Sequence, residues 1–327
     1  MKNSLTIILI LVLVTLLTLL PFFKEKFFYT QDYIFVARLH QMHKALVDGQ
    51  FPVRWSPDFR FGEPTFNFYA PLPYYLGGVF KILDLDYIPT IKLLFILSSV
   101  LSGLAMLTFI KRMFKDWMAA LTASVVYIFA PYRAVDLYVR GALSEAWAFI
   151  FFPLIFLTSL NLSGKASLKN SLFLSLSLAG LFLTHSVMTV IFLPFFVAWV
   201  IYLILREKSY RLVWIFGLSF ILGLALAATY LLPALFERQF IQSEYLLQGH
   251  FNFRAHFMAV GQFFSLFWGY GSSLWGPNDE LSFQIGVVNW IILVLSAVVI
   301  YLNRKKRELT MLFILLFVSF IFSLFMQ

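Results

Sequence analysis

Residues 31–75 read QDYIFVARLHQMHKALVDGQFPVRWSPDFRFGEPTFNFYAPLPYY, a polar and aromatic stretch in a chain that is otherwise mostly apolar. Its first third has helical spacing, with an apolar stripe at Phe35, Leu39, Met42 and Leu46. Gly49 is a natural helix stop, and Pro52 cannot continue a helix. The pattern predicts an amphipathic helix over 33–48 that lies at a membrane interface, with Asp32 at its start.

Composition decides the class of protein. Hydrophobic residues make up 61% of the 327 residues and charged residues 13%. Several apolar runs approach or exceed the length that crosses a bilayer, which predicts an all-α polytopic membrane protein. The chain has no cysteine. Disulfides, thiolate metal sites and a cysteine nucleophile are therefore excluded.

Nine apolar runs predict nine transmembrane helices in a single transmembrane domain over 1–327. They lie near 4–23, 89–110, 117–131, 147–162, 170–184, 187–205, 212–232, 283–302 and 309–326. The first run lacks a small-residue cleavage site, so we interpret it as a retained helix rather than a signal peptide. The chain stops at Gln327 without a polar tail, and we expect a chain truncated at its C-terminus.

The connections between these runs alternate in character. Those near residues 111–115, 164–169, 206–211 and 303–307 are short and basic, which places them and the N-terminus in the cytoplasm. The other side receives three predicted outer loops, at 24–88, 131–146 and 233–282. The net charge of +9 is then mainly a signal of topology, and nucleic acid is not needed as a partner. We expect a multi-pass protein of the inner or plasma membrane.

The second outer loop carries a charge cluster. Arg133, Asp136 and Arg140 stand at i, i+3 and i+7, so they can share one helical face. One interpretation is structural: Asp136 bridges both arginines, Ser144 caps the next helix, and Glu145 is stabilised by that helix's N-terminal dipole. The other is that the two arginines bind a phosphate or diphosphate, for which the guanidinium fork is well suited. Both can hold together.

Two further polar positions interrupt apolar sequence. His185 lies between Thr184 and Ser186, either as a polar hinge or as a donor or acid–base group facing a cavity. Glu237 and Arg238 follow Pro233 where another run ends, and an ordinary exposed helix end is the simplest interpretation. The late loop also contains His250, Arg254 and His256, to which the sequence assigns no chemistry.

Several segments resemble the GT-C superfamily of membrane glycosyltransferases, and within it a bacterial branch labelled 6-pyruvoyl-tetrahydropterin synthase-related membrane proteins. The resemblance rests on an acid and a large loop after the first run. It also rests on GxFPxRW at 49–55, FYxPLxYY at 68–75, APYRxxDLYxRGAxSE at 130–145 and THS at 184–186, and it covers the chain to about residue 237. No histidine triad within a soluble fold supports pterin chemistry.

The resemblance implies transfer of a sugar from a polyprenyl-phosphate donor to a glycan, lipid or protein acceptor on the outer face. A carboxylate must take the proton of the acceptor hydroxyl, and Asp32 fits this role by position, although an N-cap of the 33–48 helix is an equal alternative. Arg133, Arg140, His185 and Arg238 are candidates to hold the phosphate, with Asp136, Glu145 and Glu237 beside the substrate. Many GT-C members have two acids in the first loop. These acids form D-x-D or E-x-D, whereas Asp32 of this chain is preceded by Thr30 and Gln31, which leaves a divalent metal cofactor open without a strong ligand motif.

A transporter or flippase for a lipid-linked glycan is the main rival, and a non-catalytic assembly subunit is a third alternative. A carrier should place ionisable groups near the middle of the bilayer, within broken helices. Here the acids and arginines gather at one predicted face, which favours an enzyme or a receptor-like binder over a carrier.

Overall fold

The computed structural model describes residues 2–242, 248–249, 252–274, 279–303 and 305–325. Within these ranges the fold is all-α, with two isolated β-bridges in loops. His250, residues 243–247 and residues 275–278 of the predicted late loop lie outside the described residues.

The predicted apolar runs coincide with helices. The long helices are α1 (Lys2–Thr18), α5 (Tyr87–Phe114), α6 (Trp117–Ile128), α8 (Leu143–Gly164), α9 (Leu168–Phe182), α10 (Ser186–Glu207), α11 (Arg211–Leu226), α13 (Val287–Leu302) and α14 (Arg307–Phe325). Among the described residues, α5, α8 and α10 are long and apolar enough to cross a membrane. Two bent pairs raise that number to as many as five. The chain is thus a helical membrane protein with three to five clear candidate spans.

The bent pairs lie where the sequence predicts the third and seventh runs to end. α6 continues after a 46° bend into α7 (Pro131–Val135) and the π-helical turn η2 (Asp136–Arg140). α11 breaks at Ala227 and turns by 76° into α12 (Ala228–Phe236) and the 3-10 turn η3 (Glu237–Phe240). The predicted continuous helix over 212–232 is therefore wrong, because α12 leaves the axis of α11.

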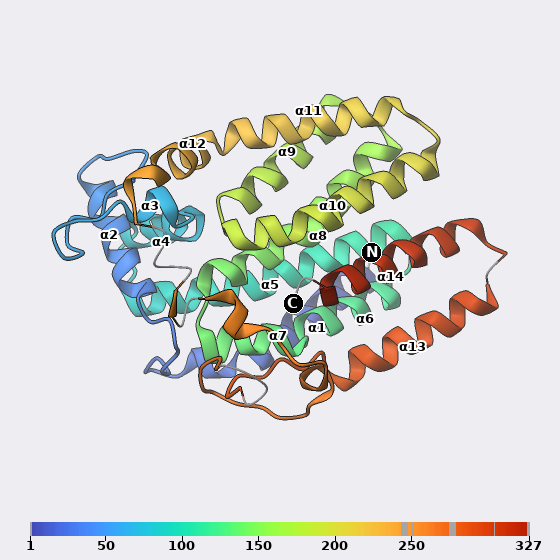
Figure 1. Ribbon diagram of the computed structural model, residues 1–327, viewed down its shortest axis with the longest axis horizontal. Coiled ribbons are helices and arrows are strands. Elements are labelled where there is room, and N and C mark those ends of the chain that lie inside the picture. The colour runs from blue at the N-terminus through green and yellow to red at the C-terminus, as the bar shows by residue number, and fades with distance from the viewer. Residues whose placement is uncertain (1, 243–247, 250–251, 275–278, 304, 326–327) are drawn as a thin grey trace.

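Short helices gather at one end of the bundle. Figure 1 shows α2 (Phe35–Val47), α3 (Thr65–Phe68), α4 (Leu72–Ile82) and α12 together at the left. The turns between α10 and α11 and between α13 and α14 lie at the right. Arg112 Nε donates a 2.8 Å hydrogen bond to Asn161 Oδ1, which ties the predicted basic connection at 111–115 to the last turn of α8. The basic connections and the predicted outer loops thus occupy different ends of the molecule.

The apolar stripe of α2 is buried as a helix of that pattern requires, but its partner is the protein. Phe35, Leu39 and Met42 are each at most 1% exposed. They belong to a core with side chains of α4, α5 and α8. Two glycines of α4 allow this close packing: a Cβ at Gly77 would lie 2.7 Å from Leu39 Cδ1, and one at Gly78 would lie 2.6 Å from Leu46 Cδ1. The prediction that this stripe holds α2 against the membrane surface is therefore wrong.

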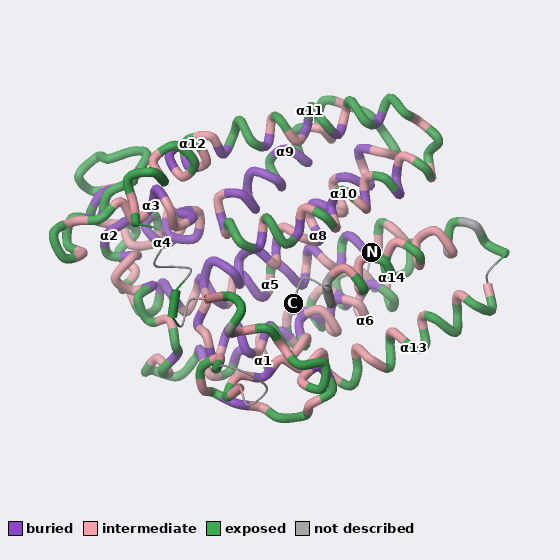
Figure 2. Tube along the Cα trace, viewed as in Figure 1, coloured by how far each residue is buried: buried purple, intermediate pink, exposed green. Residues whose placement is uncertain are grey.

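The core is centred on α5 and α8. α5 packs against α1, α4, α6 and α8, and α8 packs against α9 and α10. Figure 2 shows buried segments concentrated around these helices. Among the described residues of α13 none is buried, and that helix packs against α14 at the edge of the bundle. The polar end therefore rests on a rigid apolar base.

Candidate functional site

The first and second outer loops are joined through their backbones. Gln31 N–H donates to the carbonyl of Val139 at 2.9 Å, and Asp32 N–H donates to the carbonyl of Arg140 at 2.8 Å. This places Asp32 directly beside the Arg140 backbone, although 108 positions separate them in the sequence.

Gly141 makes this approach possible. Its φ is +68°, which favours glycine, and a Cβ there would collide with the Thr30 side chain and lie 2.9 Å from the Asp32 carbonyl oxygen. Gly141 N–H also closes the π-helical turn on the carbonyl of Asp136. π-helical turns are rare and often occur at functional sites. Gly141 is therefore the point at which the two outer loops are assembled.

Asp32 does not cap α2 in the predicted way. The helix begins at Phe35, and the N-cap position is Ile34, which has no capping side chain. Asp32 Oδ1 instead accepts from Ile34 N–H at 3.2 Å, and Oδ2 accepts from Arg38 Nη1 at 3.3 Å. The side chain keeps 33% of its surface exposed. Asp32 is thus an oriented carboxylate that solvent or a substrate can still reach.

Arg38 is a residue of this site that the sequence does not single out. Its guanidinium lies 3.8 Å from the centre of the Tyr69 ring. Burial alone would lower the pKa of Arg38, but Tyr74, Tyr69 and Asp32 outweigh burial, so the pKa is raised. Arg38 therefore stays charged beside Asp32. No sequence signal could have found this pair, because Asp32 precedes the helix and its spacing to Arg38 is not a helical one.

Arg140 is held by two carboxylates. Its Nη1 lies 2.8 Å from Glu145 Oε2 and 3.3 Å from Asp136 Oδ1, and it also donates to the Tyr132 hydroxyl at 3.0 Å. The Tyr132 hydroxyl donates to the other oxygen of Glu145. The side chains of Asp136 and Glu145 are 1% and 4% exposed, whereas that of Arg140 is 34% exposed. The predicted Asp136–Arg140 contact is therefore present and is extended by Glu145 and Tyr132.

The predicted bridge from Asp136 to both arginines is only half present. Arg133 is 3% exposed and forms no ion pair within the described part of the chain. Its guanidinium lies 5.1 Å from the Tyr127 ring centre and 4.9 Å from that of Phe149. Nη1 of Arg133 and Oδ2 of Asp136 find no hydrogen-bond partner among the described residues. Arg133 precedes the π-helical turn, and its side chain packs against rings of α6 and α8 instead of pairing with Asp136.

Helix α8 begins two residues earlier than a Ser144 cap predicts. Ala142 is the N-cap, so Ser144 is in the first turn and does not cap the helix. Its hydroxyl has no hydrogen-bond partner among the residues described. Glu145 is also in this first turn, where the helix dipole favours a carboxylate as expected.

His185 is the N-cap of α10. Its Nδ1 accepts from Met188 N–H at 3.1 Å, so the neutral ring carries its proton on Nε2. Burial lowers the pKa of His185, while the charges of Glu145 and Arg140 act on it in opposite directions. His185 is therefore a neutral N–H donor beside the Arg140 cluster near pH 7. It is a polar residue at the junction of two helices and a hydrogen-bond donor, so both roles that the sequence left open apply to it.

Glu237 and Arg238 lie apart from the arginine cluster. Glu237 accepts from the Asn67 side chain and lies 3.7 Å from Arg54. Arg238 is exposed on η3 and has no ion pair among the described residues. α12 nevertheless borders the site, because the Tyr230 hydroxyl bonds to Ser186 Oγ at 2.7 Å and to the Phe68 carbonyl at 3.3 Å.

The site is thus a ring of polar segments that lie far apart in the chain. Leu72 N–H donates to the carbonyl of Leu183 at 2.9 Å, which ties the start of α4 to the turn before His185. Within the described ranges, no three His, Cys, Asp or Glu side chains group as metal ligands. The arrangement offers the accessible carboxylate of Asp32, a neutral imidazole and three arginines (Arg38, Arg133 and Arg140) in different states of pairing.

Comparison with known proteins gives a family but no solved structure. Residues 66–326 match the family described as "6-pyruvoyl-tetrahydropterin synthase related domain; membrane protein". The chain is 28% identical over 245 residues to an "Uncharacterized protein" of Lactococcus lactis subsp. cremoris strain MG1363. That alignment covers 72% of this chain and 40% of the relative, so the chain spans less than half of the relative's length. No solved structure matches.

Proposed function

Because this chain belongs to the 6-pyruvoyl-tetrahydropterin synthase related family of membrane proteins, we propose a function carried out at a membrane surface. The protein is an integral membrane glycosyltransferase that moves a sugar from a polyprenyl-phosphate donor to a glycan, lipid or protein acceptor. The reaction takes place on the extracytoplasmic face of the plasma membrane.

The proposed topology has nine spans with the N-terminus in the cytoplasm. The three clear spans, the two bent pairs and four shorter apolar helices supply these nine crossings. The basic connections lie at one end of the bundle, and α2, α3 and α12 lie at the other (Figure 1). Lysine and arginine favour the cytoplasmic side, so Asp32, Arg140, His185 and Glu237 are extracytoplasmic.

The observation that carries this function is the backbone pairing of Asp32 with Arg140. It brings an accessible carboxylate next to a cation cluster, and glycosyl transfer from a phosphate needs both. The carboxylate removes a proton from the incoming nucleophile, and the cations stabilise the departing phosphate.

Each group has a defined task in this reaction. The acceptor hydroxyl oxygen bonds to the anomeric carbon of the sugar while the bond from that carbon to the phosphate oxygen breaks. The hydroxyl proton passes to Asp32, which Arg38 orients through the 3.3 Å contact. The phosphate leaves with the bonding electrons and an added negative charge. The transition state has oxocarbenium character, so negative charge nearby also stabilises it.

Arg140 and Arg133 have different roles in the proposed reaction. Arg140 is already paired with two carboxylates, so its main task is to keep Asp136 and Glu145 in place. Arg133 retains an N–H without a partner in the described structure and is the better phosphate ligand. His185 Nε2–H supplies a second donor. Both groups can bind the phosphate without first losing an ion pair.

The test is Asp32→Asn in the full protein, reconstituted with radiolabelled polyprenyl-phosphate hexoses and membrane acceptors. Release of polyprenyl phosphate should fall by roughly 10²–10⁴, the usual contribution of a general base. Asn keeps the size of Asp and an oxygen for the Ile34 N–H, so folding should persist. Loss of the partly exposed contact to Arg38 should change stability by less than about 1 kcal/mol.

Asp58→Asn is the matched control, because Asp58 is a carboxylate in the same loop with its own cation. Lys44 Nζ lies 2.8 Å from Asp58 Oδ1, and this hydrogen bond lowers the pKa of Asp58. Turnover of this variant should match wild type. A folded Asp32→Asn protein with near wild-type turnover would exclude Asp32 as the base. Failure of the wild-type protein to release polyprenyl phosphate from any donor would refute the proposed reaction.

A further inference from the structure

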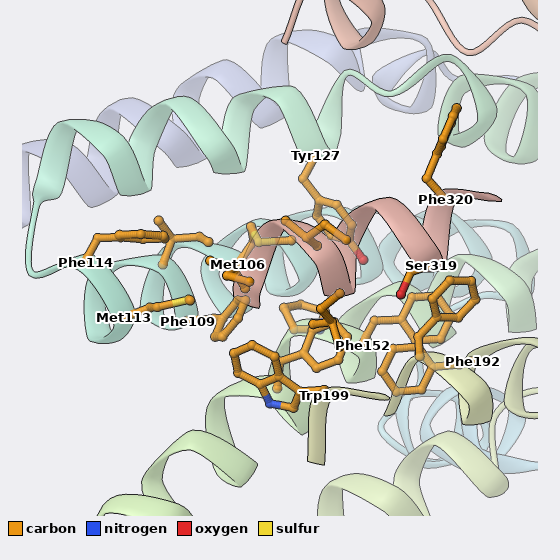
Figure 3. Close-up of a pocket in the computed structure, with 17 residues that line it drawn as sticks. Met106, Phe109, Met113, Phe114, Tyr127, Phe152, Phe192, Trp199, Ser319 and Phe320 are labelled. Atoms are coloured by element: carbon orange, nitrogen blue, oxygen red, sulfur yellow. The ribbon is translucent and has the colours of Figure 1, made fainter. Parts of the chain in front are cut away.

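An apolar groove of about 520 Å³ runs through the bundle between α5, α6, α8, α10 and α14. Figure 3 shows Met106, Phe109 and Tyr127 facing the rings of Phe152 and Phe192 across it. Along α5 the lining extends from Met106 to Phe114, which corresponds to about 12 Å of helix. The polar groups of the lining residues are few, and they include the Tyr127 hydroxyl and Ser319.

A proline shapes the end of the groove at Tyr127. Pro153 lies inside α8 and has no N–H, so the carbonyl of Phe149, four residues earlier, loses its helical partner. The Tyr127 hydroxyl donates to this carbonyl at 2.7 Å. This hydrogen bond fixes the Tyr127 ring, on which the Arg133 guanidinium lies at 5.1 Å. The apolar groove is therefore lined at this end by the Tyr127 ring, and the buried Arg133 guanidinium contacts that ring without itself lining the groove.

That cation has capacity for a ligand. Arg133 is 97% buried, and its Nη1 finds no hydrogen-bond partner among the described residues. A buried polar group without a partner is unfavourable, and a charged one more so. A ligand with a phosphate at one end and an apolar chain at the other would satisfy both Arg133 and the groove.

We infer that this groove binds the phosphate-proximal part of the polyprenyl chain of the donor, with the phosphate at Arg133. This rests on the proposed function and adds the location and length of the chain that the protein contacts. At about 30 Å³ for a water-sized atom, 520 Å³ holds roughly 17 heavy atoms, or about three isoprene units. The remaining units extend into the bilayer.

A second groove of about 580 Å³ on the other side of α14, between α13 and α14, provides an internal comparison. It is larger, but Tyr127 does not line it, and it carries no link to Arg133 through that ring. In lipid, size alone gives little selectivity, because the bilayer offers equally apolar surroundings. The link to a cation therefore favours the first groove.

The test measures binding of polyprenyl monophosphates without sugar to the full protein in lipid nanodiscs, with concentrations as mole fractions. Affinity should rise by about tenfold or more from one to three isoprene units, as packing contacts accumulate. It should change by less than about twofold from three units to eleven. A continuous rise to eleven units, or equal binding of phosphatidic acid, would overturn the inference.

Two serines of similar exposure allow a matched pair of variants. Ser319 lines the groove at Tyr127, and Ser296 lines the groove between α13 and α14. Ser319→Trp should weaken binding of the three-unit phosphate by about tenfold, because the indole occupies the groove. Ser296→Trp should leave it unchanged. Equal effects of the two substitutions would place the chain elsewhere.

A measurement on the wild-type protein removes dependence on the folding of either variant. A three-unit phosphate with a diazirine at its far end should label segments containing Met113 or Trp199, which line the groove away from Tyr127. Labelling confined to α13 would refute this location. Binding at this groove without release of polyprenyl phosphate from labelled donors would reject the proposed reaction alone. Sugar transfer that is insensitive to Ser319→Trp would reject the groove alone.

Discussion

Replacing Arg140 by glutamine removes the cation that two buried carboxylates share. Its Nη1 lies 2.8 Å from Glu145 and 3.3 Å from Asp136, whose side chains are 4% and 1% exposed. Removing one partner of a buried ion pair typically destabilises a protein by about 3–5 kcal/mol. Arg140 itself is 34% exposed, and solvent screening weakens its contribution. We therefore expect Arg140→Gln to lower the free energy of unfolding by about 2–3 kcal/mol.

A double-mutant cycle separates this charge effect from loss of packing. Glu145→Gln removes one of the carboxylates, so the double variant leaves less uncompensated charge than Arg140→Gln alone. Its destabilisation should be smaller than the sum of the two single effects by about 1–2 kcal/mol. The assay is unfolding by SDS in mixed micelles, followed by tryptophan fluorescence for all four proteins.

Arg206→Gln serves as the control for the substitution itself. Arg206 pairs with the adjacent Glu207 at 2.5 Å, at the basic end of the bundle. Neighbouring surface pairs contribute less than about 1 kcal/mol, so this variant should unfold almost as wild type does. Additive effects of Arg140→Gln and Glu145→Gln, or an Arg140→Gln protein as stable as wild type, would refute the ion-pair account of the cluster.

Two further predictions concern topology and pH. On this cysteine-free background, single cysteines replace Asp58 and Lys208 in turn. In intact cells an impermeant thiol reagent should label position 58 and not position 208. The opposite pattern would reverse the orientation. The pKa of His185 is lowered in the folded state, so the unfolded state binds more protons below about pH 6.5 and stability falls as the pH falls through this range. His185→Asn keeps an N-cap. Between about pH 7.5 and about pH 5.5, the melting temperature of this variant should fall less than that of wild type. An equal fall in both proteins would show that His185 does not contribute to the pH dependence of stability.

The charge cluster over 133–145 shows the limit of spacing arguments. Helical spacing correctly brings Asp136 next to Arg140. It fails for Arg133, because that side chain lies among the rings of Tyr127 and Phe149. Those rings belong to α6 and α8, and a periodicity within residues 131–146 carries no information about them. The contact that keeps Arg133 buried is a tertiary one.

Helix α4 was not predicted because its sequence has weak helical signals. Pro71 and Pro73 stand at its start and Gly77 and Gly78 in its middle, and it falls within the predicted outer loop over 24–88. Glycine lowers helix propensity, but here both glycines let α2 pack closely. Burial of the α2 stripe compensates for the weak propensity, and this gain exists only in the folded protein.

The sequence by itself determined the class of protein and the positions of its long apolar helices and polar segments, because apolar run length and side-chain period are local properties. It also identified Asp32, the 133–145 cluster, His185 and Glu237 as exceptions to the apolar pattern. Only the tertiary structure decided which of them meet. The pairing of Asp32 with the Arg140 backbone depends on Gly141 and on a separation of 108 positions, and no local pattern specifies contacts at that range. Glu237 lies instead with Asn67 and Arg54, because α12 turns away from α11 and packs on α3.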